Sequence, residues 1–259
     1  MNREAAPLTR VSKYRTKGEG YHTWLERKPI KLTIYATIVI LIGGLIQIIP
    51  TLLVKSNIPT ISSVQPYTPL ELEGRDIYIR EGCIGCHSQM IRPFRSEVER
   101  YGPYSKAGEF VYDHPFLWGS KRTGPDLHRI GQKYSDSWHL NHMYDPQSTS
   151  PNSIMPSYKW LITSELDKSQ TQEKMRTMVS LGVPYTDDQI ENAHQHMAAQ
   201  GAQIEANLHD DPDFVKNYKA DKAYATKNGN DFIEIRNREI VAVIAYIQRL
   251  GTDIKVKNK

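Results

Sequence analysis

The strongest pattern in this sequence is an uninterrupted apolar run near its amino terminus. Residues 33–54 read TIYATIVILIGGLIQIIPTLLV, 22 residues without a charge between Lys31 and Lys55. As a helix, this run would reach about 33 Å, enough for a hydrocarbon core of roughly 30 Å. A cleaved signal peptide is the alternative, but its apolar region is usually about 7–15 residues long and ends at a small-residue cleavage site. The pattern therefore predicts an uncleaved transmembrane anchor at residues 32–54.

The charges on either side of the anchor predict its orientation. Residues 1–31 carry eight Lys and Arg against three acidic residues, whereas Lys55 is the only basic residue between the anchor and Arg75. Because basic flanks stay on the cytoplasmic side, we expect residues 1–31 to form a cytoplasmic tail. Residues 55–68 then form a short linker, and residues 69–259 form an extracytoplasmic domain.

Beyond the linker, the pattern favours helices and loops over strands. The segment TPLE at 68–71 is a capping box with proline at the first helical position, and it predicts a helix over 69–81. The segment TDDQ at 186–189 is a second capping box, from which we expect a helix that runs to Gly201. A last helix is predicted over 237–250, with its apolar residues on one face. Since no alternating strand pattern is present, we predict a mainly α fold.

Two tracts of this domain lack a clear periodicity of hydrophobic residues, and we interpret them as insertions. Residues 91–122 are rich in Arg, Tyr, Pro and Gly, which predicts a long structured loop. Its arginines and aromatic residues are types enriched at protein interfaces, so we expect an interface element here. A second insertion is expected near residues 202–235, where the tract 202–231 is polar.

Composition and charge narrow the possible partners. The chain is 39% hydrophobic, with a mean hydropathy of −0.55, so most of it is water-soluble. Of the net charge of +4, the amino-terminal tail contributes 8 − 3 = +5 and the rest contributes 25 − 26 = −1. The excess of basic charge therefore indicates the orientation of the chain in the membrane, and nucleic acid is not expected as a partner. Two cysteines are too few for a disulfide framework.

Both cysteines stand in one short motif, CIGCH at residues 83–87. A disulfide would leave His87 without a role, and a zinc site would need two more ligands nearby. A thioredoxin-like redox pair favours a βαβ setting, which the pattern lacks. A c-type haem uses all three groups: Cys83 and Cys86 bind the porphyrin as thioethers, and His87 coordinates the iron. The motif therefore predicts one covalently bound haem c.

The order of motifs resembles class I cytochrome c. A helix ends in CxxCH, TGPDL follows at 123–127, then a Met-Pro loop in SPNSIMPSY, then a terminal helix with an aromatic residue. The resemblance implies that the carbonyl of Pro125 accepts a hydrogen bond from His87. It also implies that a loop methionine stiffened by prolines is the second axial ligand, which favours Met155. The alternatives for this ligand are Met143, His139 and His142.

A narrower resemblance covers the anchor, the motif and the segments that follow it. The stretch GCIGCHSQMIRPFRSEVERYGPYSKAGEFVYDHPFLWGSKRTGPDLHRIG and the later SIMPSYKWL are similar to the monohaem cytochrome c subunit, subunit II, of cbb3-type cytochrome c oxidases. The likeness runs from about Leu32 to Leu161 and returns over the final helix. The insertion at 91–122 makes this resemblance specific, because small soluble cytochromes have no segment that corresponds to it.

This resemblance implies an electron-transfer subunit of a bacterial terminal oxidase. Such a subunit relays single electrons from a dihaem cytochrome c subunit, or from a soluble cytochrome donor, to the b-type haem of the catalytic haem–copper subunit. Oxygen would be reduced in that subunit and not in this chain. The implied location is the inner membrane, with the haem domain in the periplasm. The closest alternative is the monohaem anchor subunit of a nitric oxide reductase, against which the insertion and the chain length argue.

Overall fold

The computed structural model describes residues 20–54, 56 and 58–255 of the 259-residue chain. The chain divides into two compact units after Ile58. The first 19 residues of the predicted cytoplasmic tail, Lys55 and Asn57 of the predicted linker, and residues 256–259 of the predicted domain lie outside the described residues.

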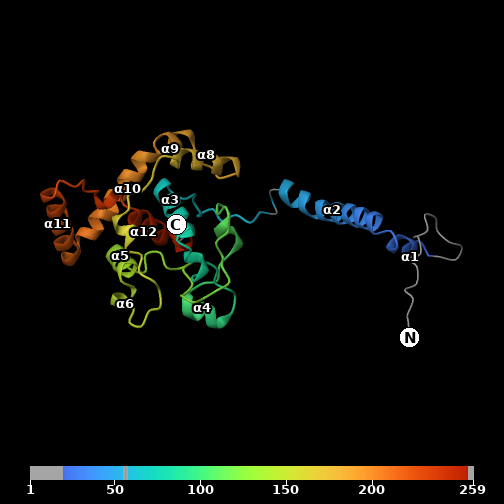
Figure 1. Cartoon of the computed structure of the whole chain (residues 1–259), viewed down its shortest axis with the longest axis horizontal. Helices are drawn as coiled ribbons and strands as arrows, with labels where there is room; N and C mark the ends of the chain where they lie inside the picture. The colour runs from blue at the N-terminus through green and yellow to red at the C-terminus, as the bar shows by residue number, and fades with distance from the viewer. Residues whose placement is uncertain (1–19, 55, 57, 256–259) are drawn as a thin grey trace, which may run out of the picture. The chain divides into compact units, whose positions relative to one another are not determined.

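The first unit contains two helices, α1 (Tyr21–Glu26) and α2 (Pro29–Leu53), drawn in blue in Figure 1. α2 begins with proline at its first position. An N–H at this position would make no hydrogen bond within the helix, so proline, which lacks one, is tolerated there. α2 therefore starts slightly before the predicted anchor at 32–54. None of its side chains is buried, and among the described residues it is the one helix long and apolar enough to cross a membrane.

The second unit is built from helices and loops. Its described residues contain no β-strand beyond an isolated bridge between Glu165 and Arg238. The predicted mainly α fold is therefore confirmed. In chain order the helices are α3 (Pro69–Arg80), η2 (Cys83–Gly85), α4 (Arg95–Tyr101), η3 (Ala107–Phe110), α5 (Asp136–Tyr144), α6 (Pro146–Thr149), α7 (Trp160–Thr163), α8 (Thr171–Ser180), α9 (Asp187–Glu191), α10 (Ala193–His209), α11 (Pro212–Lys227), η4 (Ile235–Asn237), α12 (Glu239–Arg249) and η5 (Asp253–Lys255).

Two helices from opposite ends of this unit, α3 and α12, cross at its centre (Figure 1). α3 begins with the predicted capping box: the Thr68 N–H donates to the Glu71 carboxylate at 2.8 Å, and the Thr68 hydroxyl accepts from the Glu71 N–H at 3.3 Å. At the crossing, a Cβ on Gly74 would lie 1.8 Å from the carbonyl oxygen of Ala242. Glycine therefore allows the two backbones to approach this closely.

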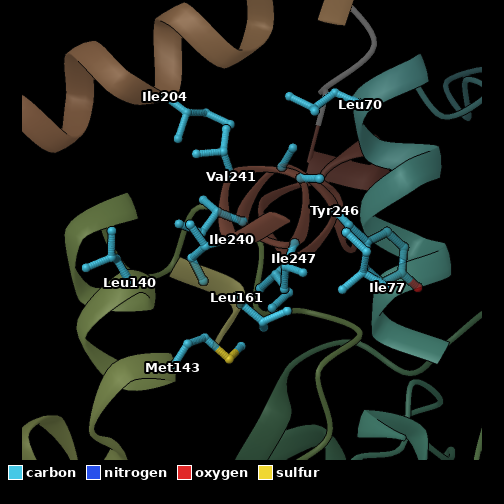
Figure 2. Close-up of a cluster of buried hydrophobic side chains, with 14 of the residues drawn as sticks. Leu70, Ile77, Leu140, Met143, Leu161, Ile204, Ile240, Val241, Tyr246 and Ile247 are labelled. Atoms are coloured by element: carbon cyan, nitrogen blue, oxygen red, sulfur yellow. The ribbon is translucent and has the colours of Figure 1, made fainter. Parts of the chain in front are cut away.

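α12 is buried all round, which corrects the prediction of a terminal helix with one apolar face. Every residue from Glu239 to Ile247 is buried, because α3, α5, α7 and α10 pack around the helix. The rings of Tyr78 and Tyr246 meet edge to face, 5.4 Å apart. Figure 2 shows the main core, which contains Leu70 and Ile77 from α3, Leu140 and Met143 from α5, Leu161 from α7, Ile204 from α10, and Ile240, Val241, Tyr246 and Ile247 from α12.

The tract after the second capping box is helical, and the predicted end at Gly201 is wrong. α10 continues to His209, and α11 covers most of the polar tract at 202–231. A Cβ on Gly201 would lie 3.1 Å from the carbonyl oxygen of Arg236. The glycine therefore serves close packing of α10 on η4 instead of a helix end. Leu208, fully buried, holds the extension against the core.

The insertion at 91–122 contains two short helices, α4 and η3, between loop segments. Ile91 and Phe110 are buried and fasten it to the domain. Phe116 and Trp118 instead stack on each other at 4.4 Å between ring centroids and are 51% and 37% exposed. The insertion is therefore an ordered segment with part of its aromatic surface in solvent.

Candidate functional site

The CIGCH segment begins where α3 ends. Gly82 has a φ of 72°, in the left-handed region that glycine tolerates, and turns the chain out of the helix. The turn η2 follows, closed by a hydrogen bond from the N–H of Cys86 to the carbonyl of Cys83 at 3.1 Å. Since residues three apart eclipse each other in a 3-10 turn, the two cysteines project from the same side. Both are free thiols; Cys83 is half-buried and Cys86 is exposed.

The surroundings of Cys83 do not activate it as a nucleophile. Burial, with a smaller contribution from the Glu81 carboxylate, raises the pKa of the Cys83 thiol to about 12. Redox-active cysteine pairs instead have lowered pKa values, so this environment disfavours a thioredoxin-like pair. Ile84, Met155 and Tyr158 are likewise half-buried against the main core. Cys83 therefore lies at an apolar border of the domain.

The imidazole of His87 is held by the TGPDL segment. Its Nδ1 lies 2.9 Å from the carbonyl oxygen of Pro125. Because a carbonyl only accepts, Nδ1 carries the proton and the lone pair of Nε2 is available for a metal. Burial lowers the pKa of His87, which favours the neutral ring. A Cβ on Gly124 would lie 2.2 Å from Cε1 of the ring, so glycine lets this loop press against the imidazole.

Met155 lies in the loop between α6 and α7 and is half-buried against the main core. Its N–H donates to the hydroxyl of Ser153 at 3.2 Å, and the loop is tied to α5 by a hydrogen bond from the N–H of Tyr158 to the carbonyl of Met143 at 2.7 Å. The side chain of Met143 is 7% exposed and belongs to the core drawn in Figure 2. Of these two methionines, the loop residue is the more accessible.

The two histidines of α5 differ in their surroundings. Nδ1 of His142 lies 2.6 Å from the hydroxyl of Thr149. Burial, with a smaller contribution from His87, lowers the pKa of His142. His139 is buried, its pKa is lowered to about 4 by burial, and its Nε2 has no hydrogen-bond partner in the described part of the chain. Its ring meets Tyr134 edge to face.

The donor set fits a haem. Two thiols leave one turn on the same side, the neutral imidazole of His87 keeps Nε2 available, and the side chain of Met155 is half-buried against the same core cluster as Cys83. The described residues contain no group of three or more His, Cys, Asp or Glu side chains that could hold a metal ion.

Sequence reasoning pointed to the chemical groups of this site and missed the residues that position them. Gly124 was already part of the TGPDL segment, but its contact with the imidazole follows only from the structure. Ser88 and Asp126 directly follow His87 and Pro125, and they hydrogen-bond to each other across 38 positions of the chain. No local pattern signals such a contact.

A helical domain in which the first and last helices cross, with CxxCH at the end of the first, is that of a class I cytochrome c. The family described as Cytochrome C oxidase, mono-heme subunit/FixO matches residues 22–254, and the chain belongs to this family. The predicted resemblance to a monohaem oxidase subunit is confirmed. Membership supports one haem, a role in electron transport and association with other oxidase subunits. No curated protein matches the chain.

Proposed function

We propose that this chain is the electron-transfer subunit of a bacterial cbb3-type terminal oxidase. It relays single electrons through one covalent haem c to the b-type haem of the catalytic haem–copper subunit. The donor is a dihaem cytochrome c subunit or a soluble cytochrome. The observation that supports this proposal most directly is the contact between the His87 imidazole and the Pro125 carbonyl. It occurs at an intact C-x-x-C-H turn in a chain of the FixO family. The family description names an oxidase, which favours this function over the nitric oxide reductase subunit.

Each site residue has its own part in this proposal. Cys83 and Cys86 would hold the porphyrin through thioether bonds. His87 would bind the iron through Nε2, while the carbonyl of Pro125 fixes the imidazole ring through Nδ1–H. Met155 would supply a soft, neutral sulfur as a second protein ligand to the iron. The bound haem provides a reversible one-electron change, and histidine–methionine ligation raises its reduction potential.

The proposal places α2 as a single-pass anchor in the bacterial inner membrane. The eight basic residues among residues 1–31 support a cytoplasmic amino terminus. The segment at 55–68 then links the anchor to a periplasmic haem domain. Oxygen reduction belongs to the catalytic subunit, so this chain acts by delivering electrons.

We assign contact with the other subunits to the insertion at 91–122. Its exposed, stacked rings Phe116 and Trp118 are of types enriched at protein interfaces, as are its exposed arginines Arg92 and Arg95. Long ordered loops in compact domains are usually functional. The buried residues of this insertion keep that surface in a fixed shape, which reduces the entropy lost on association.

Covalent attachment is tested by denaturing electrophoresis after acid–acetone extraction. Haem-dependent peroxidase stain should remain at the chain mass of 29.7 kDa. Its loss from the wild-type chain would contradict the haem c proposal. The electron-transfer role is tested by mild-detergent purification, in which a haem–copper subunit should accompany the chain and its b-type haem should be reduced only when this chain is present. Reduction at an equal rate without the chain would refute the role.

The second axial ligand is tested with a pair of variants. Met155→Ala should abolish the weak long-wavelength absorption band of ferric iron bound by methionine sulfur, lower the reduction potential and admit carbon monoxide to the iron. Met143→Ala is the control, and it should keep all three properties because that side chain belongs to the core. The reverse pattern would move the ligand to α5.

A further inference from the structure

Two segments of the candidate site, about 38 positions apart, are joined by backbone hydrogen bonds. The N–H of Gly124 donates to the carbonyl of Cys86 at 2.9 Å, and the N–H of Leu127 donates to the carbonyl of Ser88 at 2.9 Å. The contact between the His87 imidazole and the TGPDL carbonyl lies between these two bonds and is also 2.9 Å long. The geometry of the imidazole contact therefore depends on how the two segments are held together.

Asp126 joins the two segments from the buried side. Its Oδ2 accepts from the hydroxyl of Ser88 at 2.6 Å and from the N–H of Met90 at 2.8 Å. Its Oδ1 accepts from the N–H of His128 at 2.9 Å. The side chain is 0% exposed, so these bonds replace the water that the carboxylate loses on burial. The carboxylate is therefore fixed in position by three donors.

Arg122 completes the arrangement. Its Nε donates to the hydroxyl of Ser88 at 2.7 Å and its Nη2 to the carbonyl of Met90 at 2.8 Å. The guanidinium also lies 3.5 Å from the Asp126 carboxylate, which gives the buried charge a partner. Glu97 accepts from Arg122 at 2.8 Å and holds the guanidinium from the other side. The hydroxyl of Ser88 thus accepts a hydrogen bond from the Arg122 guanidinium and donates one to the Asp126 carboxylate.

We propose that Ser88, Arg122 and Asp126 form a clamp that sets the reduction potential of the haem through the histidine ligand. Ser88 and Asp126 directly follow the donor and the acceptor of the imidazole hydrogen bond, so movement of either one displaces that bond. A strong hydrogen bond from Nδ1–H makes the imidazole a more basic ligand, which favours ferric iron and lowers the potential. Loosening the clamp therefore raises the potential. The proposal rests on the haem site proposed above and names the residues that tune it.

Ser88→Ala tests the clamp because it removes one hydroxyl and no charge. Thr171→Val is the matched control, since the hydroxyl of Thr171 also donates to a buried carboxylate, that of Glu73, at 2.6 Å. The haem-loaded full chain in mild detergent is used for a redox titration and for NMR of the His87 Nδ1 proton in the ferrous state. We expect a higher midpoint potential and faster exchange of this proton in Ser88→Ala alone, with the haem stain unchanged.

Equal potentials and exchange rates in the two variants would overturn the clamp, whatever their stabilities. If Ser88→Ala does not accumulate, Arg122→Lys takes its place, because it keeps the charge but lacks the planar fork that reaches Ser88 and Met90 together. A potential equal to that of the wild-type chain would then overturn the clamp. Absence of covalent haem from the wild-type chain would overturn the proposed function, and the clamp with it, so the two failures are distinguishable.

Discussion

Replacing Gly74 with alanine should force α3 and α12 apart. The added Cβ would lie 1.8 Å from the carbonyl oxygen of Ala242 and 2.5 Å from its carbonyl carbon. Ordinary van der Waals contact begins near 3.4 Å, so one helix must move by about 1.6 Å in a core that packs like a solid. Both atoms belong to the backbone of α12, and no change of side-chain rotamer can relieve the overlap.

Two opposing effects set the size of the change in stability. Alanine is a better helix former than glycine by about 0.8–1.0 kcal/mol, so an unobstructed site would gain stability. Overpacking a dense core costs about 1–3 kcal/mol, and a collision between two backbones belongs at the upper end. We expect a net loss of about 2 kcal/mol, equivalent to a fall in melting temperature of roughly 4–8 °C for a domain of this size.

Thermal unfolding of the full chain in detergent, followed by helical circular dichroism, measures this loss. Gly201→Ala in α10 is the matched control, because its Cβ would lie 3.1 Å from the nearest atom and the neighbour needs to yield only slightly. Its melting temperature should stay near that of the wild-type chain. If Gly74→Ala melts at or above the wild-type temperature, the close approach of α3 and α12 is wrong.

Two further predictions concern acid stability and the insertion at 91–122. Burial and the neighbouring Arg129 lower the pKa of His128 to about 3, whereas an unfolded histidine titrates near 6.5. Between these values the unfolded chain binds a proton that the folded chain does not, so stability should fall with falling pH by up to about 1.4 kcal/mol per pH unit. Urea unfolding of His128→Asn should show a shallower pH slope, and an unchanged slope would refute the assignment. Replacing Phe116 and Trp118 together by alanine should leave the haem spectrum intact and slow electron delivery to the oxidase. Tyr224→Ala, which removes a ring 70% exposed on α11, should not slow it, and equal rates for the two variants would limit the insertion to local packing.

Local signals predicted the elements that local interactions stabilise. The capping box at Thr68 and the glycine at position 82 bound α3 to within one residue, and the apolar run predicted α2 closely. The part of α10 beyond Gly201 and the whole of α11 were missed because their sequence is polar and weakly periodic. Their stability depends on contacts with distant parts of the chain, such as those of Leu208 and Tyr218 in the main core.

The candidate site likewise contains residues that local sequence signals predict and residues whose roles depend on distant contacts. Cys83, Cys86 and His87 lie within five consecutive residues, so their chemistry can be predicted from spacing alone. The role of Pro125 required a family resemblance, because the residue lies 38 positions from the imidazole it contacts. Nothing in the sequence singles out Asp126, since a buried carboxylate and a surface carboxylate look alike until the three donors around it are known.

The crossing of α3 and α12 also has a consequence for the order in which the chain is made. Arg80 at the end of α3 pairs with Glu239 at the start of α12, 159 positions later, through hydrogen bonds of 2.8 and 2.6 Å. At a synthesis rate of roughly 5–20 residues per second, the CIGCH segment exists for about 10–30 s before the ribosome delivers the helix that closes the core. During that interval the burial that raises the pKa of Cys83 is incomplete, so its thiol is more accessible and more acidic than in the finished domain. An enzyme that modifies Cys83 on the nascent chain would therefore meet a more open substrate than one that acts on the finished domain, where this side chain is half-buried.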